Sequence, residues 1–221
     1  MVPAIGETSV PARVKIVAGV AMTAAVAPSL TGMDDLATTW VTAILTETLI
    51  GLALGVMLRL FVMCLQIAGT IAAQTVSLSQ LLGGVADPVP AIGQTLVVGG
   101  LALAVTLGLH IRAIEFVLLS YELFPQAAWP DARLLSGWGV ERVSRVFALG
   151  FLLAAPFVIV SLLYNLTLGV INRAMPQLMV AFVGAPAITL GGILMLCVTA
   201  PLMLAVWAEA LHRFLGSGGL P

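Results

Sequence analysis

Long stretches of this chain carry no charged residue, and their lengths predict membrane-length helices. Uncharged apolar runs cover residues 16–33, 60–86, 88–109, 146–172 and 174–208, and another apolar stretch covers 41–58. Since about 20 apolar residues cross a bilayer, length alone allows five or six spans. The pattern therefore predicts an all-α, membrane-associated fold.

Glycine and proline interrupt nearly every one of these runs. The predicted breaks and kinks are at Gly83-Gly84, residues 87–90, Gly99-Gly100, Pro156 and Pro201. Such residues bend or end helices, so we expect bent and broken helical hairpins rather than straight spans. A polar segment at 126–144, which contains Trp129 and Trp138, is typical of an interfacial loop and divides the chain into two parts.

Polar side chains form a stripe in the apolar region at 165–178. At helical spacing, Asn165, Gly169, Asn172, Arg173 and Pro176 fall on one face. An arginine at the centre of a lipid-facing helix costs roughly 2.5 to 3.5 kcal/mol. Pro176 also removes a backbone donor that hydrocarbon cannot replace. The face is therefore expected to meet protein, either inside one membrane bundle or against other subunits.

The segment at 46–69 repeats this pattern, because Glu47, Gly51, Gly55 and Arg59 are spaced four apart. Glu47 and Arg59 are about 18 Å apart along a helix axis, so their partners must come from elsewhere. The two glycines form a G-x-x-x-G step that lets another backbone approach closely. We interpret this segment as a helix buried in an assembly.

Composition narrows the class of protein. Hydrophobic residues make up 61% and charged residues 9% of 221 residues, and the mean hydropathy is +1.14, far from the values of soluble domains. A net charge of -1 argues against nucleic acid as a partner. The cysteines Cys64 and Cys197 lie in apolar runs and are interpreted as reduced packing residues. The apolar run at 16–27 is expected to be a retained helix rather than a cleaved signal peptide.

Enzyme chemistry is not predicted. His110 and His212 are far apart in sequence, and neither a nucleophile elbow nor a phosphate-binding glycine loop is present. His110 is expected to be an interfacial or packing residue, and His212 a polar residue at a helix end. We expect no enzyme activity, no cofactor and no metal.

Ordered motifs along nearly the whole chain carry a resemblance to a known family. They are SVPARVKI at 9–16, VAPSL at 26–30, ETLIGLALG at 47–55, AGTIAAQ at 68–74, Asp87-Pro88, GLH at 108–110, SYELFP at 120–125 and NLTLGVINRAMPQLMVAFVGAP at 165–186. With these residues the chain resembles the FliR/SctT family of type III secretion export-gate components. Asn165 and Asn172, together with Ala187-Ile188-Thr189 where virulence-type SctT members usually carry a lysine, favour the flagellar branch.

The resemblance implies a subunit of a closed helical channel in the bacterial inner membrane, within the flagellar basal body. Its implied partners are FliP and FliQ, with FlhB and FlhA, membrane lipid, and the unfolded flagellar subunits that pass through. Residues 1–130 would form a FliP-like half and 131–221 a FliQ-like hairpin, joined in one compact unit. Family members usually have an apolar helix before the position of Met1, and this chain begins near the end of that helix.

The resemblance also assigns roles to particular residues. Residues 76–90 correspond to a loop that obstructs the closed pore, with Leu81, Leu82, Gly83, Gly84 and Val85 as its plug; an ordinary connecting loop is the alternative. The loop departs from the family pattern at Gln74-Thr75-Val76-Ser77. The residues expected to pack in the assembly are Glu47, Gly51, Gly55, Arg59, Gln74, Asn165, Gly169, Asn172, Arg173, Pro176, Gln177, Gly184 and Pro186.

Two other classes stay open at the level of sequence. A small-solute secondary transporter also uses broken helices with polar groups at mid-membrane. The chain is short for that class and shows no repeated half with matching breaks. A purely structural membrane scaffold is the third class.

Overall fold

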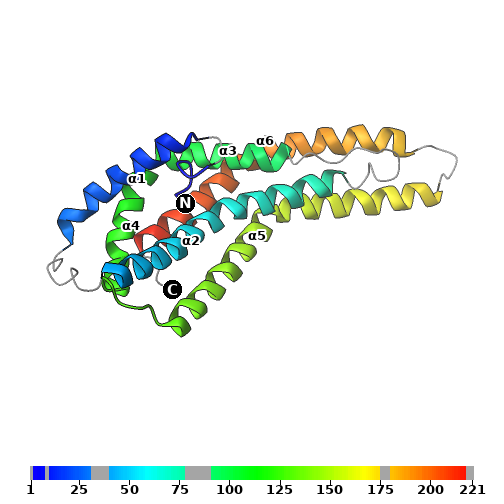
Figure 1. Cartoon of the computed structure of the whole chain (residues 1–221). Coiled ribbons are helices and arrows are strands. Elements are labelled where there is room, and N and C mark those ends of the chain that lie inside the picture. Colours follow the sequence, from blue (N-terminus) through cyan, green and yellow to red (C-terminus); the bar gives the residue numbers. More distant parts are fainter. Residues whose placement is uncertain (1, 8–9, 31–39, 78–90, 175–179, 218–221) are drawn as a thin grey trace. The chain divides into compact units, whose positions relative to one another are not determined.

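The computed structural model describes residues 2–7, 10–30, 40–77, 91–174 and 180–217, and within these ranges all regular secondary structure is helical (Figure 1). The elements are α1 (Ala12–Val26), the short 3-10 helix η1 (Ala27–Ser29), α2 (Trp40–Ser77), α3 (Ala91–Thr106), α4 (Leu109–Leu123), α5 (Ala132–Ala174) and α6 (Val180–Gly216). The all-α prediction is confirmed.

Three of these helices are much longer than a single bilayer crossing requires. α2, α5 and α6 contain 38, 43 and 37 residues. Among the described residues, four helices are long and apolar enough to cross a membrane, or five if the bent pair α3–α4 is one span. Length alone allowed five or six spans, and the runs on either side of Arg59 lie in the single helix α2. Arginine is a good helix former, so it ends an apolar run without ending the helix.

The break in the third apolar run is not where the glycine pair predicted it. Gly99 and Gly100 lie inside the continuous helix α3. The chain turns instead at Gly108, which has a left-handed φ of 81°, and α3 and α4 meet there at a bend of 75°. Glycine adopts this conformation at little cost. α5 and α6 continue past Pro156 and Pro201.

The predicted interfacial loop is shorter than expected. α4 ends at Leu123 and α5 begins at Ala132, so residues 132–144 of the segment 126–144 are helical. The carboxylate of Asp131 explains the early start, because its Oδ1 accepts a hydrogen bond from the Arg133 N–H at 2.8 Å. This is the usual N-cap interaction, which satisfies a donor that the first helical turn leaves unpaired.

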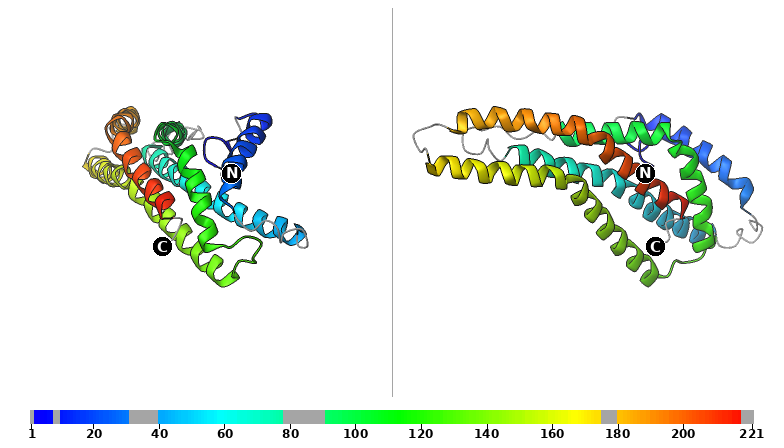
Figure 2. Two further views of the ribbon diagram at one scale, coloured as in Figure 1. Left: turned by 90° about the vertical axis from the view of Figure 1, so that its left-hand side faces the viewer. Right: turned by 180° about the vertical axis from the view of Figure 1, so that it is seen from behind.

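The chain folds as two compact units, and α2, α3, α5 and α6 contribute to both. Unit 1 consists of Met1–Val62, Leu101–Arg145 and Ala208–Pro221. Unit 2 consists of Met63–Gly100 and Val146–Trp207. Two further views of the helices are given in Figure 2. The sequence-based division into a half at residues 1–130 and a half at 131–221 stays a prediction.

Aromatic side chains from three helices form the core of unit 1. The Phe214 ring in α6 lies 5.1 Å from the Phe61 ring in α2 and 5.2 Å from the Phe116 ring in α4. The guanidinium of Arg142 in α5 lies 4.9 Å from the Phe214 ring centroid. Such a cation–π contact holds a buried charge against an apolar core. The cluster therefore ties the last turns of the chain to three earlier helices.

In unit 2 the second half of α2 packs against α3, α5 and α6. Cys64, Leu65, Ala68 and Ala72 are fully buried along one side. A Cβ placed on Gly69 would lie 2.1 Å from the Gly93 Cα, so α2 and α3 cross with their backbones in direct contact. Small residues at such positions allow this close approach between membrane helices.

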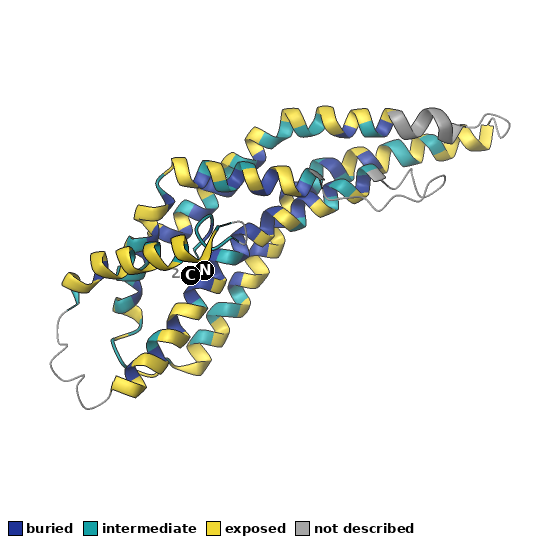
Figure 3. Cartoon of the chain, turned by 45° about the horizontal axis from the view of Figure 1, so that its top comes forward, coloured by how far each residue is buried: buried dark blue, intermediate teal, exposed yellow. Residues whose placement is uncertain are grey.

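Apolar side chains also cover much of the surface. Figure 3 shows exposed positions along α1 and along α5 and α6. In α1, Val17 and Val20 are 67% and 64% exposed, and in unit 2 Leu162 and Val198 are 68% and 78% exposed. Surfaces of this kind are covered by lipid or by other protein chains in the cell.

Candidate functional site

The polar stripe, defined here as Asn165, Gly169, Asn172 and Arg173, lies on the last turns of α5 in unit 2. Its members share one helix, as predicted. Gly169, Asn172 and Arg173 are exposed, and the apolar neighbours Leu166 and Val170 are 66% and 63% exposed. Arg173 makes no hydrogen bond or ion pair with any other residue that the structure describes. The stripe is therefore a polar surface within an apolar one.

Asn165, the first residue of the stripe, is connected to α2 by a chain of hydrogen bonds through Ser161. Asn165 Nδ2 donates to the Ser161 carbonyl at 2.8 Å and approaches Ser161 Oγ at 3.2 Å. Ser161 Oγ in turn donates to the Thr75 carbonyl at 2.8 Å. Thr75 lies near the described end of α2. Ser161 therefore joins α2 to α5 through a buried hydrogen bond.

Sequence reasoning missed Ser161, although one signal was available. The residue is a serine four positions before Asn165 in an apolar part of α5, and only 6% of its surface is exposed. A buried polar group needs a partner. Its spacing from Asn165 places both on one face, but only the fold brings the Thr75 carbonyl to that face.

Replacing Ser161 with alanine is expected to destabilise unit 2 by about 1 to 3 kcal/mol, since it leaves the buried Thr75 carbonyl without its donor. The thermal unfolding midpoint of the purified protein in detergent should fall by several degrees. Thr167→Val is the matched control, because the Thr167 hydroxyl bonds only its own helix, at Leu163 O, and is exposed. Equal midpoints for the two variants would contradict the role of Ser161 in joining α5 to α2.

A cavity of about 310 Å³ lies beside this hydrogen bond between Ser161 and Thr75 in unit 2. It is lined by Thr75 and Val76 from α2, Ser161 and Tyr164 from α5, and Gly192 from α6. A Cβ on Gly192 would lie 2.5 Å from a Val76 methyl carbon. The last described turn of α2 therefore lies between α5 and α6, next to the end of the polar stripe that begins at Asn165.

The second predicted stripe, on α2, has partners within unit 1. Glu47 accepts hydrogen bonds from the Tyr121 hydroxyl at 3.0 Å and from the Ala127 N–H at 3.3 Å. Arg59 forms an ion pair with Glu7, with Arg59 Nη1 3.9 Å from Glu7 Oε1. The partners do come from other segments, as expected, but the charges are not unpaired. The inference that unpaired charges bury this helix in an assembly therefore loses its basis, and the packing role of these residues stays a prediction.

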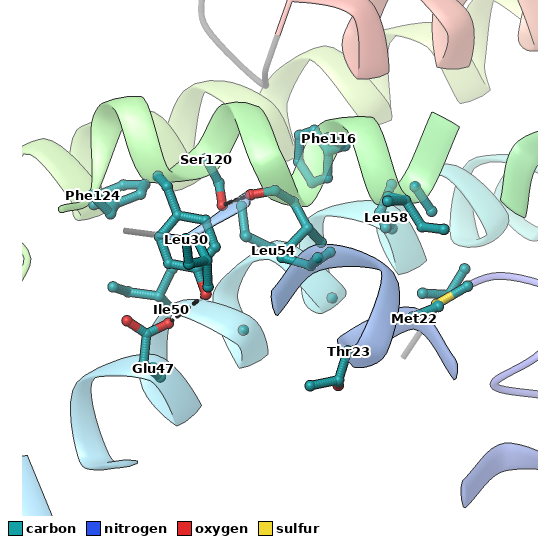
Figure 4. Close-up of a pocket in the computed structure, with 18 of the residues that line it drawn as sticks. Met22, Thr23, Leu30, Glu47, Ile50, Leu54, Leu58, Phe116, Ser120 and Phe124 are labelled. Carbon is teal, nitrogen blue, oxygen red and sulfur yellow. Dashed lines mark hydrogen bonds between the residues drawn. The ribbon is translucent and has the colours of Figure 1, made fainter. Parts of the chain in front are cut away.

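Gly51 and Gly55 lie between those charges and border a second cavity, of about 400 Å³ (Figure 4). Gly55 is buried, whereas Gly51 is exposed and a Cβ placed on it would meet nothing within 4 Å. Within the described part of the chain, no helix backbone approaches Gly51. At Gly51, therefore, the G-x-x-x-G step makes no close helix contact among the described residues.

Several predicted residues fall outside what the structure describes. The plug residues Leu81, Leu82, Gly83, Gly84 and Val85, and the motif residues Pro176 and Gln177, lie outside the described ranges. Gly184 and Pro186 lie in α6, with no described surroundings. Gln74 is exposed near the end of α2. Among the described residues, no three histidine, cysteine or acidic side chains are grouped so that they could hold a metal ion.

Comparison with known proteins gives a consistent result over nearly the whole chain. Residues 1–214 match the family described as bacterial export proteins, family 1. The chain is similar to the flagellar biosynthetic protein FliR of Caulobacter vibrioides, at 29% identity over 96% of this chain and 88% of that protein.

Other relatives carry the same description. The flagellar biosynthetic protein FliR of Escherichia coli K12 is 28% identical over 91% of this chain and 79% of its own length. The protein of that name from Aquifex aeolicus is 30% identical over 77% of this chain and 67% of its own length.

Proposed function

Since this chain belongs to the bacterial export proteins, family 1, we propose that it is a subunit of the flagellar protein export gate. In this role it helps to form the closed channel through which unfolded flagellar subunits leave the cytoplasm. The relatives are flagellar biosynthetic proteins from distantly related bacteria. The proposed role is structural, with no catalytic step.

The exposed polar stripe is the observation that carries this proposal. A guanidinium in a lipid-facing helix is unfavourable, by roughly 2.5 to 3.5 kcal/mol at the bilayer centre, and Arg173 is exposed beside the apolar positions Leu166 and Val170. Another polypeptide would supply acceptors for the guanidinium and for the Asn172 amide. The stripe is then a surface that other gate subunits cover, in a complex with FliP and FliQ at the bacterial inner membrane.

Purification in mild detergent tests the proposed assembly. Tagged protein, expressed with FliP and FliQ, should elute in one large complex whose intact mass corresponds to a single copy of this chain plus several copies of each partner. A homodimer that binds a small solute would instead support a secondary transporter. That alternative is not favoured, because the relatives are flagellar biosynthetic proteins.

Residues 81–85 keep their proposed role as a plug by family resemblance alone. Substituting bulky residues for Gly83 and Gly84, or deleting the loop, is expected to raise ion leak or to alter secretion, because a closed channel depends on an apolar, water-excluding constriction. Unchanged leak together with unchanged motility would contradict the plug.

A further inference from the structure

The cavity of unit 1 is long and narrow. On α2 its wall extends from Glu47 to Leu58, and on α4 from Ala113 to Phe124, so each wall is about 16 Å long at 1.5 Å per residue. Spread over that length, a volume of about 400 Å³ corresponds to a mean cross-section of about 25 Å². This corresponds to a groove between about 5 and 6 Å across. α1 forms its third wall.

These dimensions discriminate between possible occupants. A helix with its side chains is about 10 to 12 Å across, so a partner helix is too wide to enter. A single hydrocarbon chain, whose carbons keep about 4 Å from their neighbours, fits. The helices that line the cavity all belong to segments apolar enough to cross a membrane. The apolar compound available to them is therefore membrane lipid.

The two ends of the cavity differ in chemistry. Figure 4 shows Glu47 and Phe124 toward one end and Leu58 toward the other. Glu47 is the only charged residue among the described lining residues. Its carboxylate accepts from the Tyr121 hydroxyl and the Ala127 N–H, which uses about half of the lone-pair sites that an ionised carboxylate offers. That end is suited to a headgroup that donates hydrogen bonds and carries positive charge.

We propose that this cavity binds one acyl chain of an amine-bearing phospholipid of the ethanolamine class, with the ammonium group at Glu47. The acyl chain lies along α2 against Gly51, where the absence of a side chain makes room for it. The bound lipid fills the space between α1, α2 and α4 and completes the packing of unit 1. No covalent step is involved.

The test compares lipid retention by variants that fill the cavity or leave it open. Gly51→Phe adds a ring at the wall of the cavity, and its Cβ has nothing within 4 Å. Gly137→Phe is the matched control, because Gly137 in α5 is equally open and does not line the cavity. The intact assembly is prepared with equal amounts of dioleoyl phosphatidylethanolamine and dioleoyl phosphatidylglycerol, and retained lipid is counted by native mass spectrometry.

The wild type and Gly137→Phe should each retain one phosphatidylethanolamine per copy of this chain. Gly51→Phe should retain about tenfold less phosphatidylethanolamine. Glu47→Gln should keep a bound lipid but lose the preference for phosphatidylethanolamine over phosphatidylglycerol. Equal retention by Gly51→Phe and Gly137→Phe overturns the proposal. So does failure of Gly51→Phe alone to assemble, which would indicate a polypeptide in the cavity. An unchanged preference in Glu47→Gln overturns the headgroup assignment.

Discussion

Replacing Gly69 with alanine is expected to disrupt unit 2, whereas the same substitution at Gly93, on the other side of the same helix crossing, is expected to leave it folded. A Cβ on Gly69 would lie 2.1 Å from the Gly93 Cα and 2.6 Å from the Gly93 nitrogen. Both are backbone atoms, so no side-chain rotation relieves the overlap. Van der Waals contact requires about 3.5 to 4.0 Å, and α2 and α3 would have to separate.

On the α3 side of the crossing, the structure has room for a methyl group at Gly93. A Cβ on Gly93 has its nearest neighbour, the Gly69 carbonyl carbon, at 3.6 Å, which is ordinary contact. Alanine also favours a helix by up to about 1 kcal/mol over glycine. Overpacking at Gly69 is expected to cost about 3 kcal/mol, a large part of a typical stability of 5 to 15 kcal/mol.

Thermal unfolding in detergent and a swimming assay check this difference. Gly69→Ala should lower the unfolding midpoint by about 5 to 10 °C and reduce swimming, while Gly93→Ala should match or exceed the wild type in both. Gly191→Ala, at a glycine of α6 in unit 2 where a Cβ would meet nothing within 4 Å, controls for the loss of a helical glycine as such. If Gly69→Ala and Gly93→Ala behave alike, the crossing is not as close as described here.

Reversing the charge of Arg173 is expected to prevent most of the assembly without unfolding the chain. Arg173 is exposed and makes no described contact that its loss could break. Within a complex, however, a guanidinium buried against partner acceptors contributes 2 kcal/mol or more, so Arg173→Glu should weaken assembly by about 30-fold or more. Swimming should be lost accordingly.

Two further variants separate this effect from net charge. Arg173→Lys keeps the charge but not the planar donor geometry of the guanidinium, so its assembly should be intermediate. Arg133→Glu makes the same charge change at an exposed site near the start of α5, and it should assemble normally. Gel filtration of the detergent extract measures the fraction of this chain in the large complex. Normal assembly of Arg173→Glu would contradict the role given to the stripe.

The helical class and the membrane-length segments could be predicted from the sequence, because hydropathy and helical spacing are local properties. The same locality explains the errors. Counting uncharged runs divides α2 into two segments at Arg59, although the helix continues through that residue, as the spacing of polar and small residues at 46–69 predicted. Gly99-Gly100 was expected to loosen α3, but these glycines lie at packing contacts with Leu204 and Leu65, while Gly108 makes the turn.

The contacts that hold the site in place could not be predicted from the sequence, because they join segments that are far apart along the chain. Glu47 was singled out by its charge, but its partners Tyr121 and Ala127 are more than 70 positions away. Likewise, Ser161 and Thr75 lie 86 positions apart. Gly69 falls within a motif that carried the family resemblance, yet nothing local distinguishes it from other glycines in helices. The approach of Gly93 gives it its importance.

A photo-crosslinking amino acid at position 169 shows whether other polypeptides or lipids cover the polar stripe. This position is open and leaves Arg173 in place. After illumination of cells, we expect this chain in a covalent adduct with another export-gate subunit, identified by mass spectrometry and absent without light. Adducts to lipid alone, from a chain that purifies as a solitary monomer, would contradict the account.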